Sequence, residues 1–279
     1  MSIAPRHLIR SLLTAADAGT LTAREVIAAC GLFGIQANNA RVTLARLSAT
    51  GLLMPAARGR YRLGPQAAPL AEDIAGWRDL AARTRDWNGD WIAVHVGGLR
   101  RSDRSALRAR ERALALLGLA EFERGLYLRP DNLSGGVVAA RTRLRRLGLD
   151  DAIAVFVARE LEPAREQQAR QLWDGEALTR GYRERAQALD AWREDAHRLP
   201  PEIAAREAYR LGNEAIHALV FDPLLPAPMV DTEARQAFVQ SLQQFDAAGH
   251  AIWQTFLRTA REPAPTRSSL VEPTLETLS

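Results

Sequence analysis

The sequence predicts a multidomain α+β protein, and three observations lead to this class. The chain has 279 residues, which is too long for one ordinary domain and suits two or three. Helical periodicity in the first 50 residues gives way to a short hairpin pattern, and strands and helices then alternate to about residue 160. From residue 165 the periodicity is helical, so an all-helical C-terminal domain is expected.

The overall composition is that of a globular protein in water. Hydrophobic residues make up 47% of the chain and charged residues 25%. No apolar run approaches the roughly 18 residues that a membrane span needs, and the N-terminus shows no export signal. We therefore expect a cytoplasmic location and no membrane partner. The single cysteine, Cys30, excludes an internal disulfide framework and is expected to be a core thiol.

The first predicted elements are three helices. Residues 5–16 carry leucine and isoleucine at helical spacing. Thr22 and Glu25 have the spacing of a capping box, which predicts that the second helix begins there. A third helix is expected at 36–50. Its narrow inward face consists of small and apolar residues, namely Ala40, Thr43, Leu44 and Leu47.

Two strands joined by a basic turn are expected after the third helix. Residues 51–54 lead into 58–63, where arginines alternate with other residues around Gly59. Such a hairpin is typical of the wing of a winged helix-turn-helix, in which Arg58 and Arg60 would lie along phosphates or in a minor groove. Helix, capped helix, polar-faced helix and basic hairpin in this order predict a winged helix-turn-helix over residues 1–70.

The outward face of the third helix carries the side chains expected to read DNA. Asparagine can pair bidentately with adenine and arginine with guanine, while valine can meet a thymine methyl group. The expected DNA-binding residues of the helix and wing are Gln36, Asn38, Asn39, Arg41, Val42, Arg46, Arg58 and Arg60. A solvated amphipathic helix without a partner is the alternative interpretation. The hairpin that follows favours double-stranded DNA as the partner.

Charge is divided unevenly along the chain, in which every basic residue is an arginine. Residues 1–70 contain eight arginines and two acidic residues, and residues 99–146 contain twelve arginines and five acidic residues. Residues 147–279 contain fourteen arginines and twenty-one acidic residues. The excess of arginine in residues 1–70 and 99–146 suits the binding of a polyanion, although a solvated arginine-rich surface would give the same charge totals.

A ferredoxin-like middle domain is predicted for residues 87–164, after a linker helix at 71–86. The strand and helix patterns follow one another as β-α-β-β-α-β, the order of the ferredoxin-like unit. Strands are expected at 92–96, 120–123, 125–129 and 152–158, and helices at 104–117 and 135–147. The helical domain is expected over 165–262. Residues 263–279 are rich in proline, threonine and serine and are expected to be disordered.

Four motifs, in this order, resemble those of the PaaX-type transcriptional repressors, which regulate phenylacetic acid degradation and have a GntR-like winged helix. They are RVTLARL at 41–47 with GLL at 51–53, WNGDW at 87–91, LRPDNL at 128–133 and DPLLP at 222–226. The resemblance, which extends to about residue 260, implies repression of a catabolic operon that is released by a CoA thioester such as phenylacetyl-CoA. It also implies a middle domain similar to the small nuclease of CRISPR adaptation.

The chain departs from the family pattern at Ala45 and at residues 227–233, where an aromatic-Pro-Gly stretch is usual in the family. These departures leave the particular operator and effector open, but not the class of protein.

An effector pocket is expected behind the first domain, where all six tryptophans lie. Ligand pockets favour domain interfaces lined by aromatic side chains with a few polar anchors. The expected effector-binding residues are Trp87, Trp91, Tyr127, Arg129, Arg141 and Arg145, with the helix arginines facing the phosphates of an acyl-CoA. Core packing of the tryptophans and solvent exposure of the arginines are the alternatives.

No cluster of residues indicates an enzyme, a metal or a cofactor. The sequence lacks a Gly-rich phosphate loop, a zinc-binding helix motif and a nucleophile elbow, and its five histidines are scattered. A ferredoxin-like, metal-dependent nuclease is an alternative, but its first strand would need a carboxylate at its end. Here that strand ends Val96-Gly97-Gly98, with Asp90 at its other end.

Two further expectations concern assembly and regulation. One recognition helix reads one half-site, so a homodimer is expected. A regulator that binds DNA without any effector is the alternative to a ligand-released repressor.

Overall fold

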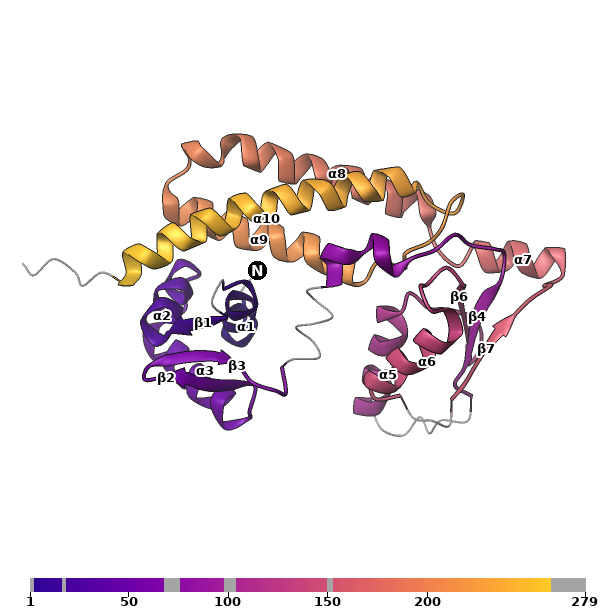
Figure 1. Cartoon of the computed structure of the whole chain (residues 1–279), viewed down its shortest axis with the longest axis horizontal. Helices are drawn as coiled ribbons and strands as arrows, with labels where there is room; N and C mark the ends of the chain where they lie inside the picture. The colour runs from indigo at the N-terminus through magenta and orange to yellow at the C-terminus, as the bar shows by residue number, and fades with distance from the viewer. Residues whose placement is uncertain (1–2, 17–18, 68–75, 98–103, 150–152, 262–279) are drawn as a thin grey trace, which may run out of the picture. The chain divides into compact units, whose positions relative to one another are not determined.

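The computed structural model describes residues 3–16, 19–67, 76–97, 104–149 and 153–261. The chain is of the α+β class, with helices and two small antiparallel sheets. It divides into two compact units (Figure 1): residues 1–66 together with the segment from 251, and residues 67–250. The expected tail at 263–279 lies outside the described residues. The finer division into five parts stays a prediction.

The described N-terminal part of the first unit contains three helices and a three-stranded sheet. The elements in chain order are α1 (Pro5–Ala15), β1 (Thr20–Thr22), α2 (Ala23–Leu32), α3 (Ala37–Ala49), β2 (Leu53–Ala57) and β3 (Arg60–Leu63). Both β1 and β2 pair antiparallel with β3, which is therefore the central strand. Apolar residues of all three helices are buried together with Leu21 and Leu53 of the sheet.

Cys30 lies inside this core, as the sequence indicated, and is fully buried. Burial raises the pKa of its thiol to about 11, because the thiolate would lose its hydration there. At neutral pH the thiol is therefore protonated and behaves as a small apolar group.

The expected capping box at the start of α2 is present. The Thr22 hydroxyl accepts a hydrogen bond from the amide of Glu25 at 3.2 Å, and the Glu25 carboxylate accepts one from the amide of Thr22 at 2.6 Å. Glu25 is fully buried, so the box is part of the core of the unit. These two bonds fix the position where α2 begins. They therefore also constrain the segment that leads from α2 to α3.

Replacing Thr22 with alanine should remove about 1 kcal/mol from the stability of α2, because the Glu25 amide loses the side-chain hydroxyl that accepts its hydrogen bond. Urea unfolding followed by circular dichroism and hydrogen exchange of the α2 amides in the full chain would measure this. Thr14, whose exposed hydroxyl only donates to the Arg10 carbonyl, is the matched control and should change stability by less than about 0.5 kcal/mol. Unchanged urea unfolding and unchanged hydrogen exchange of the α2 amides in the Thr22 variant would contradict the prediction.

From residue 76 the described part of the second unit contains two short 3-10 helices and then a four-stranded sheet with its helices. The segment expected as a linker helix, 71–86, has its first five residues outside the described part of the chain. The elements that follow are η1 (Gly76–Asp79), η2 (Ala81–Arg83), β4 (Trp91–His95), α5 (Arg104–Leu116), β5 (Ala120–Glu123), β6 (Leu126–Pro130), α6 (Gly136–Arg146) and β7 (Ala154–Ala158). The sheet order is β5-β6-β4-β7, and every pairing is antiparallel.

The two faces of this sheet are covered by different elements. On one face Ile92 and Val94 of β4 pack with residues of α5 and α6, including Leu114 and Leu144. On the other face Trp91, Ala93 and Leu128 pack with Ala169 of α7. Figure 1 shows α5 and α6 on one side of the sheet. Because β4 is central and covered on both faces, its first four residues are all buried, which explains its continuous apolar sequence.

Helices form the rest of the second unit. They are α7 (Pro163–Arg170), α8 (Gly175–Asp195), η3 (Ala196–Arg198), α9 (Pro201–Val220) and α10 (Thr232–Arg261), the last of which continues past residue 250. Aromatic pairs join α8 to α10, with ring centroids 6.3 Å apart for Tyr182 and Phe238 and 4.6 Å apart for Trp192 and Phe245. No helix in the described residues is both long and apolar enough to cross a membrane.

Candidate nucleic-acid interface

The outward face of α3 is polar and exposed along its length. Ala40, Leu44 and Leu47 are buried against the other helices, so the residues between them point away from the core. The exposed residues include every predicted DNA-reading residue of this helix, namely Asn38, Asn39, Arg41, Val42 and Arg46, and Gln36 just before it. Val42 is 41% exposed. The geometry therefore presents two amides, two guanidinium groups and one apolar group on a single surface.

The basic hairpin of the first unit joins β2 to β3 through a two-residue turn. Gly59 has a φ of +71°, a conformation that glycine adopts without strain. Its carbonyl accepts a hydrogen bond from the amide of Ala23 at 3.1 Å, which ties the turn to the start of α2. Arg58 is exposed at the tip of this turn.

The two predicted wing arginines differ in their surroundings. Arg60 is half-buried, and its guanidinium donates a hydrogen bond to the Thr20 hydroxyl of β1 at 3.1 Å. Arg62 lies two residues further along β3 and is exposed. The alternate residues of this strand, Tyr61 and Leu63, pair with core positions of the neighbouring strands. Sequence reasoning left out Arg62, although the alternation of β3 places it on the face of Arg60.

The structure brings together only some of the predicted effector residues. Trp91 is fully buried and stacks on Trp173 with a centroid distance of 6.3 Å, and Trp87 meets it edge-on at 5.2 Å. The Trp91 indole N–H donates to a carboxylate oxygen of Glu166 in α7 at 2.8 Å. Tyr127 packs with the α5 and α6 side of the sheet instead. The tryptophans and Tyr127 therefore lie on opposite faces.

Arg129 is a core residue in this structure, with 1% of its surface exposed. Its guanidinium donates to the carbonyl oxygens of Leu117 and Pro130 and to the side-chain oxygen of Asn132. Burial, followed by the charges of two nearby arginines, lowers its pKa to about 9, so it remains a cation at neutral pH. Three internal acceptors thus already bind the Arg129 guanidinium, which was expected to anchor a ligand.

The two remaining predicted arginines lie one turn apart on the exposed side of α6. Arg141 donates two hydrogen bonds to the Val155 carbonyl of β7, at 3.0 and 2.6 Å. Arg145 is exposed four residues further along.

Among the described residues, no group of three histidine, cysteine or acidic side chains is placed to hold a metal ion.

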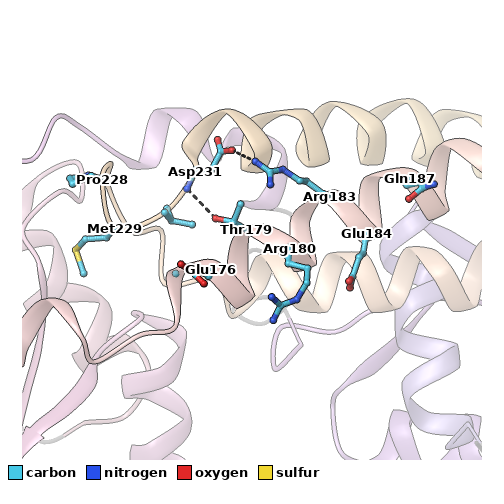
Figure 2. A pocket seen from close by; sticks show the side chains of 11 residues that line it. Glu176, Thr179, Arg180, Arg183, Glu184, Gln187, Pro228, Met229 and Asp231 are labelled. Atoms are coloured by element: carbon cyan, nitrogen blue, oxygen red, sulfur yellow. Dashed lines mark hydrogen bonds and ion pairs between the residues drawn. The ribbon is translucent and has the colours of Figure 1, made fainter.

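A groove of about 540 Å³ lies along the first turns of α8 (Figure 2). Its other wall is the 228–231 segment, where the Asp231 amide donates to the Thr179 hydroxyl at 3.1 Å and Arg183 reaches the Asp231 carboxylate at 2.6 Å. A hydrogen bond from the Ala234 amide at the start of α10 lowers the pKa of Asp231. None of the predicted effector residues lines this groove, whose walls come from segments about 50 residues apart.

A buried polar junction connects two of the sequence motifs, LRPDNL at 128–133 and DPLLP at 222–226. The side-chain amide of Asn132 donates to the Leu224 carbonyl at 2.7 Å, and the Asp222 carboxylate accepts from the Leu224 amide at 2.7 Å. Burial raises the pKa of Asp222. Gly118 lies against Pro223 so closely that a β-carbon would come within 2.5 Å of the Pro223 Cα.

A family profile matches the part of the chain that contains the DPLLP motif. Residues 173–255 match the family profile described as PaaX-like protein C-terminal domain. The resemblance to PaaX-type regulators is confirmed. The PaaX-like domain thus contains α8, α9, the DPLLP motif and most of α10. No curated protein sequence matches the chain.

One solved structure has a similar fold over nearly the whole chain. It is the uncharacterized protein Rv0674 from Mycobacterium tuberculosis, with a TM-score of 0.61 and 23% sequence identity. The similarity covers 90% of this chain and 98% of the Rv0674 chain. The fold of this chain therefore occurs over nearly its whole length in another protein.

Proposed function

We propose that the chain is a DNA-binding transcriptional regulator whose first unit is a winged helix-turn-helix. The observation that carries the proposal is the exposed face of α3, with its asparagines, arginines and Val42, followed directly by the arginine-tipped β2–β3 hairpin. The order α1-β1-α2-α3-β2-β3 is the order of winged helix-turn-helix domains, in which the third helix enters the major groove. The PaaX-like domain supports the same class of function.

The remaining parts of the domain proposal follow from the second unit. The β5-β6-β4-β7 order with α5 and α6 on one face supports a ferredoxin-like domain over 87–164. The helical domain follows over 165–262. Because one recognition helix reads a single half-site, we propose that the chain acts as a homodimer on a two-fold symmetric operator.

The effector is proposed to be an acyl-CoA thioester such as phenylacetyl-CoA, whose binding releases the operator and so relieves repression. The second unit offers two places for its phosphates: Arg141 and Arg145 on α6, and Arg180 beside the groove of Figure 2. Tyr127 packs on the face of the sheet that carries α6, whereas Trp87 and Trp91 pack on the opposite face with Met229 of the groove, so they would shape the core behind different places. A sensor also requires that the ligand bind one conformation more tightly than the other.

A band-shift experiment tests both proposals. The full chain should bind the upstream region of its own gene more tightly than a random duplex of equal length. Adding phenylacetyl-CoA, but not free CoA, should weaken the specific complex. Equal binding of both duplexes would reject a sequence-specific regulator, whereas specific binding that no acyl-CoA alters would favour an effector-independent one.

The wing gives a separate prediction. Replacing the exposed Arg58 with alanine should weaken binding to all sequences and reduce the slope of log K against log salt by about 0.9, because one phosphate contact is lost. Arg60→Ala should do less, since its guanidinium is already bonded to Thr20. Titrations of both variants at several salt concentrations would decide, and an unchanged slope for Arg58→Ala would show that the hairpin does not touch DNA.

A further inference from the structure

The first nine residues of α5 carry a row of exposed arginines that no part of the proposed function uses. Arg104, Arg108 and Arg112 are four residues apart, so they lie on one side of the helix in a row about 12 Å long. Burial of this helix begins only at Ala113, which packs on the sheet with Leu114. The arginine row therefore faces away from the sheet.

The row lacks the ion pairs that occupy other surface arginines of the same unit. None of the three arginines forms a salt bridge with a described residue, although Glu111 lies on the same helix. Asp103 precedes α5 and lies outside the described residues. By contrast, a carboxylate contacts each of Arg78, Arg85, Arg159, Arg165, Arg170, Arg183, Arg193, Arg198 and Arg210.

The arrangement is unfavourable for the helix itself. Like charges four residues apart repel each other on a helix surface. The positive end of the helix dipole disfavours a cation such as Arg104 in the first turn, which contains no acidic residue. A row of three cations that local energetics oppose, in a unit where nine other arginines contact carboxylates, suits a polyanion bound from outside.

We propose that the arginine row of α5, defined as Arg104, Arg108 and Arg112, is a second DNA-contacting surface that binds the phosphate backbone. This inference rests on the proposed function, because it assigns DNA as the polyanion. Guanidinium groups on a helix are well suited to contact successive phosphates, and such contacts position a protein without reading sequence. The row would therefore add affinity and leave base recognition to α3.

The test is a full-length variant with Arg104, Arg108 and Arg112 all replaced by glutamine. Its slope of log K against log salt should fall by up to about 2.7, or about 0.9 for each lost contact. Affinity should fall by the same factor for the upstream duplex and for a random duplex of equal length. The ratio of the two affinities should therefore not change.

The matched control replaces Arg193, Arg198 and Arg210 with glutamine, which removes the same charge from arginines that pair with carboxylates of their own neighbourhood. This control should keep the wild-type slope. Equal slopes for the two triple variants would mean that only total charge matters and would overturn the inference. If the α5 variant kept the wild-type DNA slope but lost its response to phenylacetyl-CoA, the row would be a ligand site and the inference would be wrong.

A direct readout of proximity separates failure of this inference from failure of the proposed function. An iron chelate attached to Arg108→Cys should cleave a bound upstream duplex at discrete backbone positions, while the same chelate at Arg198→Cys should not. Cys30 is fully buried and does not compete for the label. Specific DNA binding without cleavage from position 108 would overturn only the α5 inference. Absence of any DNA binding by the wild-type chain would overturn both.

Discussion

Replacing Arg129 with alanine is expected to lower the free energy of unfolding by about 3 to 5 kcal/mol, the largest effect of any single substitution proposed. The guanidinium is almost completely buried and is the donor for two backbone carbonyls and for Asn132. Removing it leaves these acceptors without a partner in the interior. It also removes a cation that lowers the pKa of the buried Asp222, so the ionised carboxylate becomes more costly.

Denaturant unfolding of the full chain measures this loss, and two further variants identify its cause. Arg124→Ala, at the exposed turn between β5 and β6, should change stability by less than about 0.5 kcal/mol. Arg129→Met keeps much of the side-chain volume but none of the donors, so it should lose nearly as much stability as Arg129→Ala. A loss below about 1 kcal/mol in both Arg129 variants would show that the junction does not depend on this group.

The junction also shows why sequence reasoning assigned Arg129 to an effector pocket. Tyr127 and Arg129 alternate with Leu128 along β6, and the register pairs Tyr127 with Val94. Val94 lies on the face that α5 and α6 cover, so Arg129 points into the same covered side. A strand pattern gives the alternation but not which face the helices cover. The burial of Arg129 also depends on Leu117 and Asn132, which no local pattern connects.

Local signals predicted the elements of both sheets well, with one omission. The expected strand at 125–129 is β6 at 126–130, and the capping box marks the start of α2 as predicted. The short strand β1 was missed because its three residues pair with β3 some 40 positions later, and nothing local signals that pairing. Long-range pairing of this kind is set by tertiary packing rather than by propensity.

The candidate interfaces differ in how far the sequence could predict them. The outward face of α3 follows from a 3.6-residue period within 13 residues, so it was predictable residue by residue. The groove of Figure 2 needs α8 and the 228–231 segment side by side, and no motif in either segment indicates it. The arginine row of α5 was visible only as a charge total, because its meaning depends on which other arginines are paired.

The second large effect is expected at the recognition helix. Arg41→Ala or Asn39→Ala should weaken binding to the upstream duplex by about 1 to 3 kcal/mol, which is roughly a 5- to 150-fold loss, and should change random-duplex binding little. Both side chains are exposed on the face of α3 opposite its buried residues, so removing them should not unfold the domain. Quantitative titration of both duplexes at one salt concentration measures the difference.

Comparison with Arg58→Ala shows whether this loss comes from base recognition. A phosphate contact, as expected for Arg58, lowers affinity for both duplexes and reduces the salt slope. A base contact lowers only the specific affinity and leaves the slope nearly unchanged. If Asn39 and Arg41 read different base pairs, their losses should add in the double variant. Equal losses on both duplexes for Arg41→Ala would mean that Arg41 holds a phosphate, and that base recognition must come from the other exposed residues of α3.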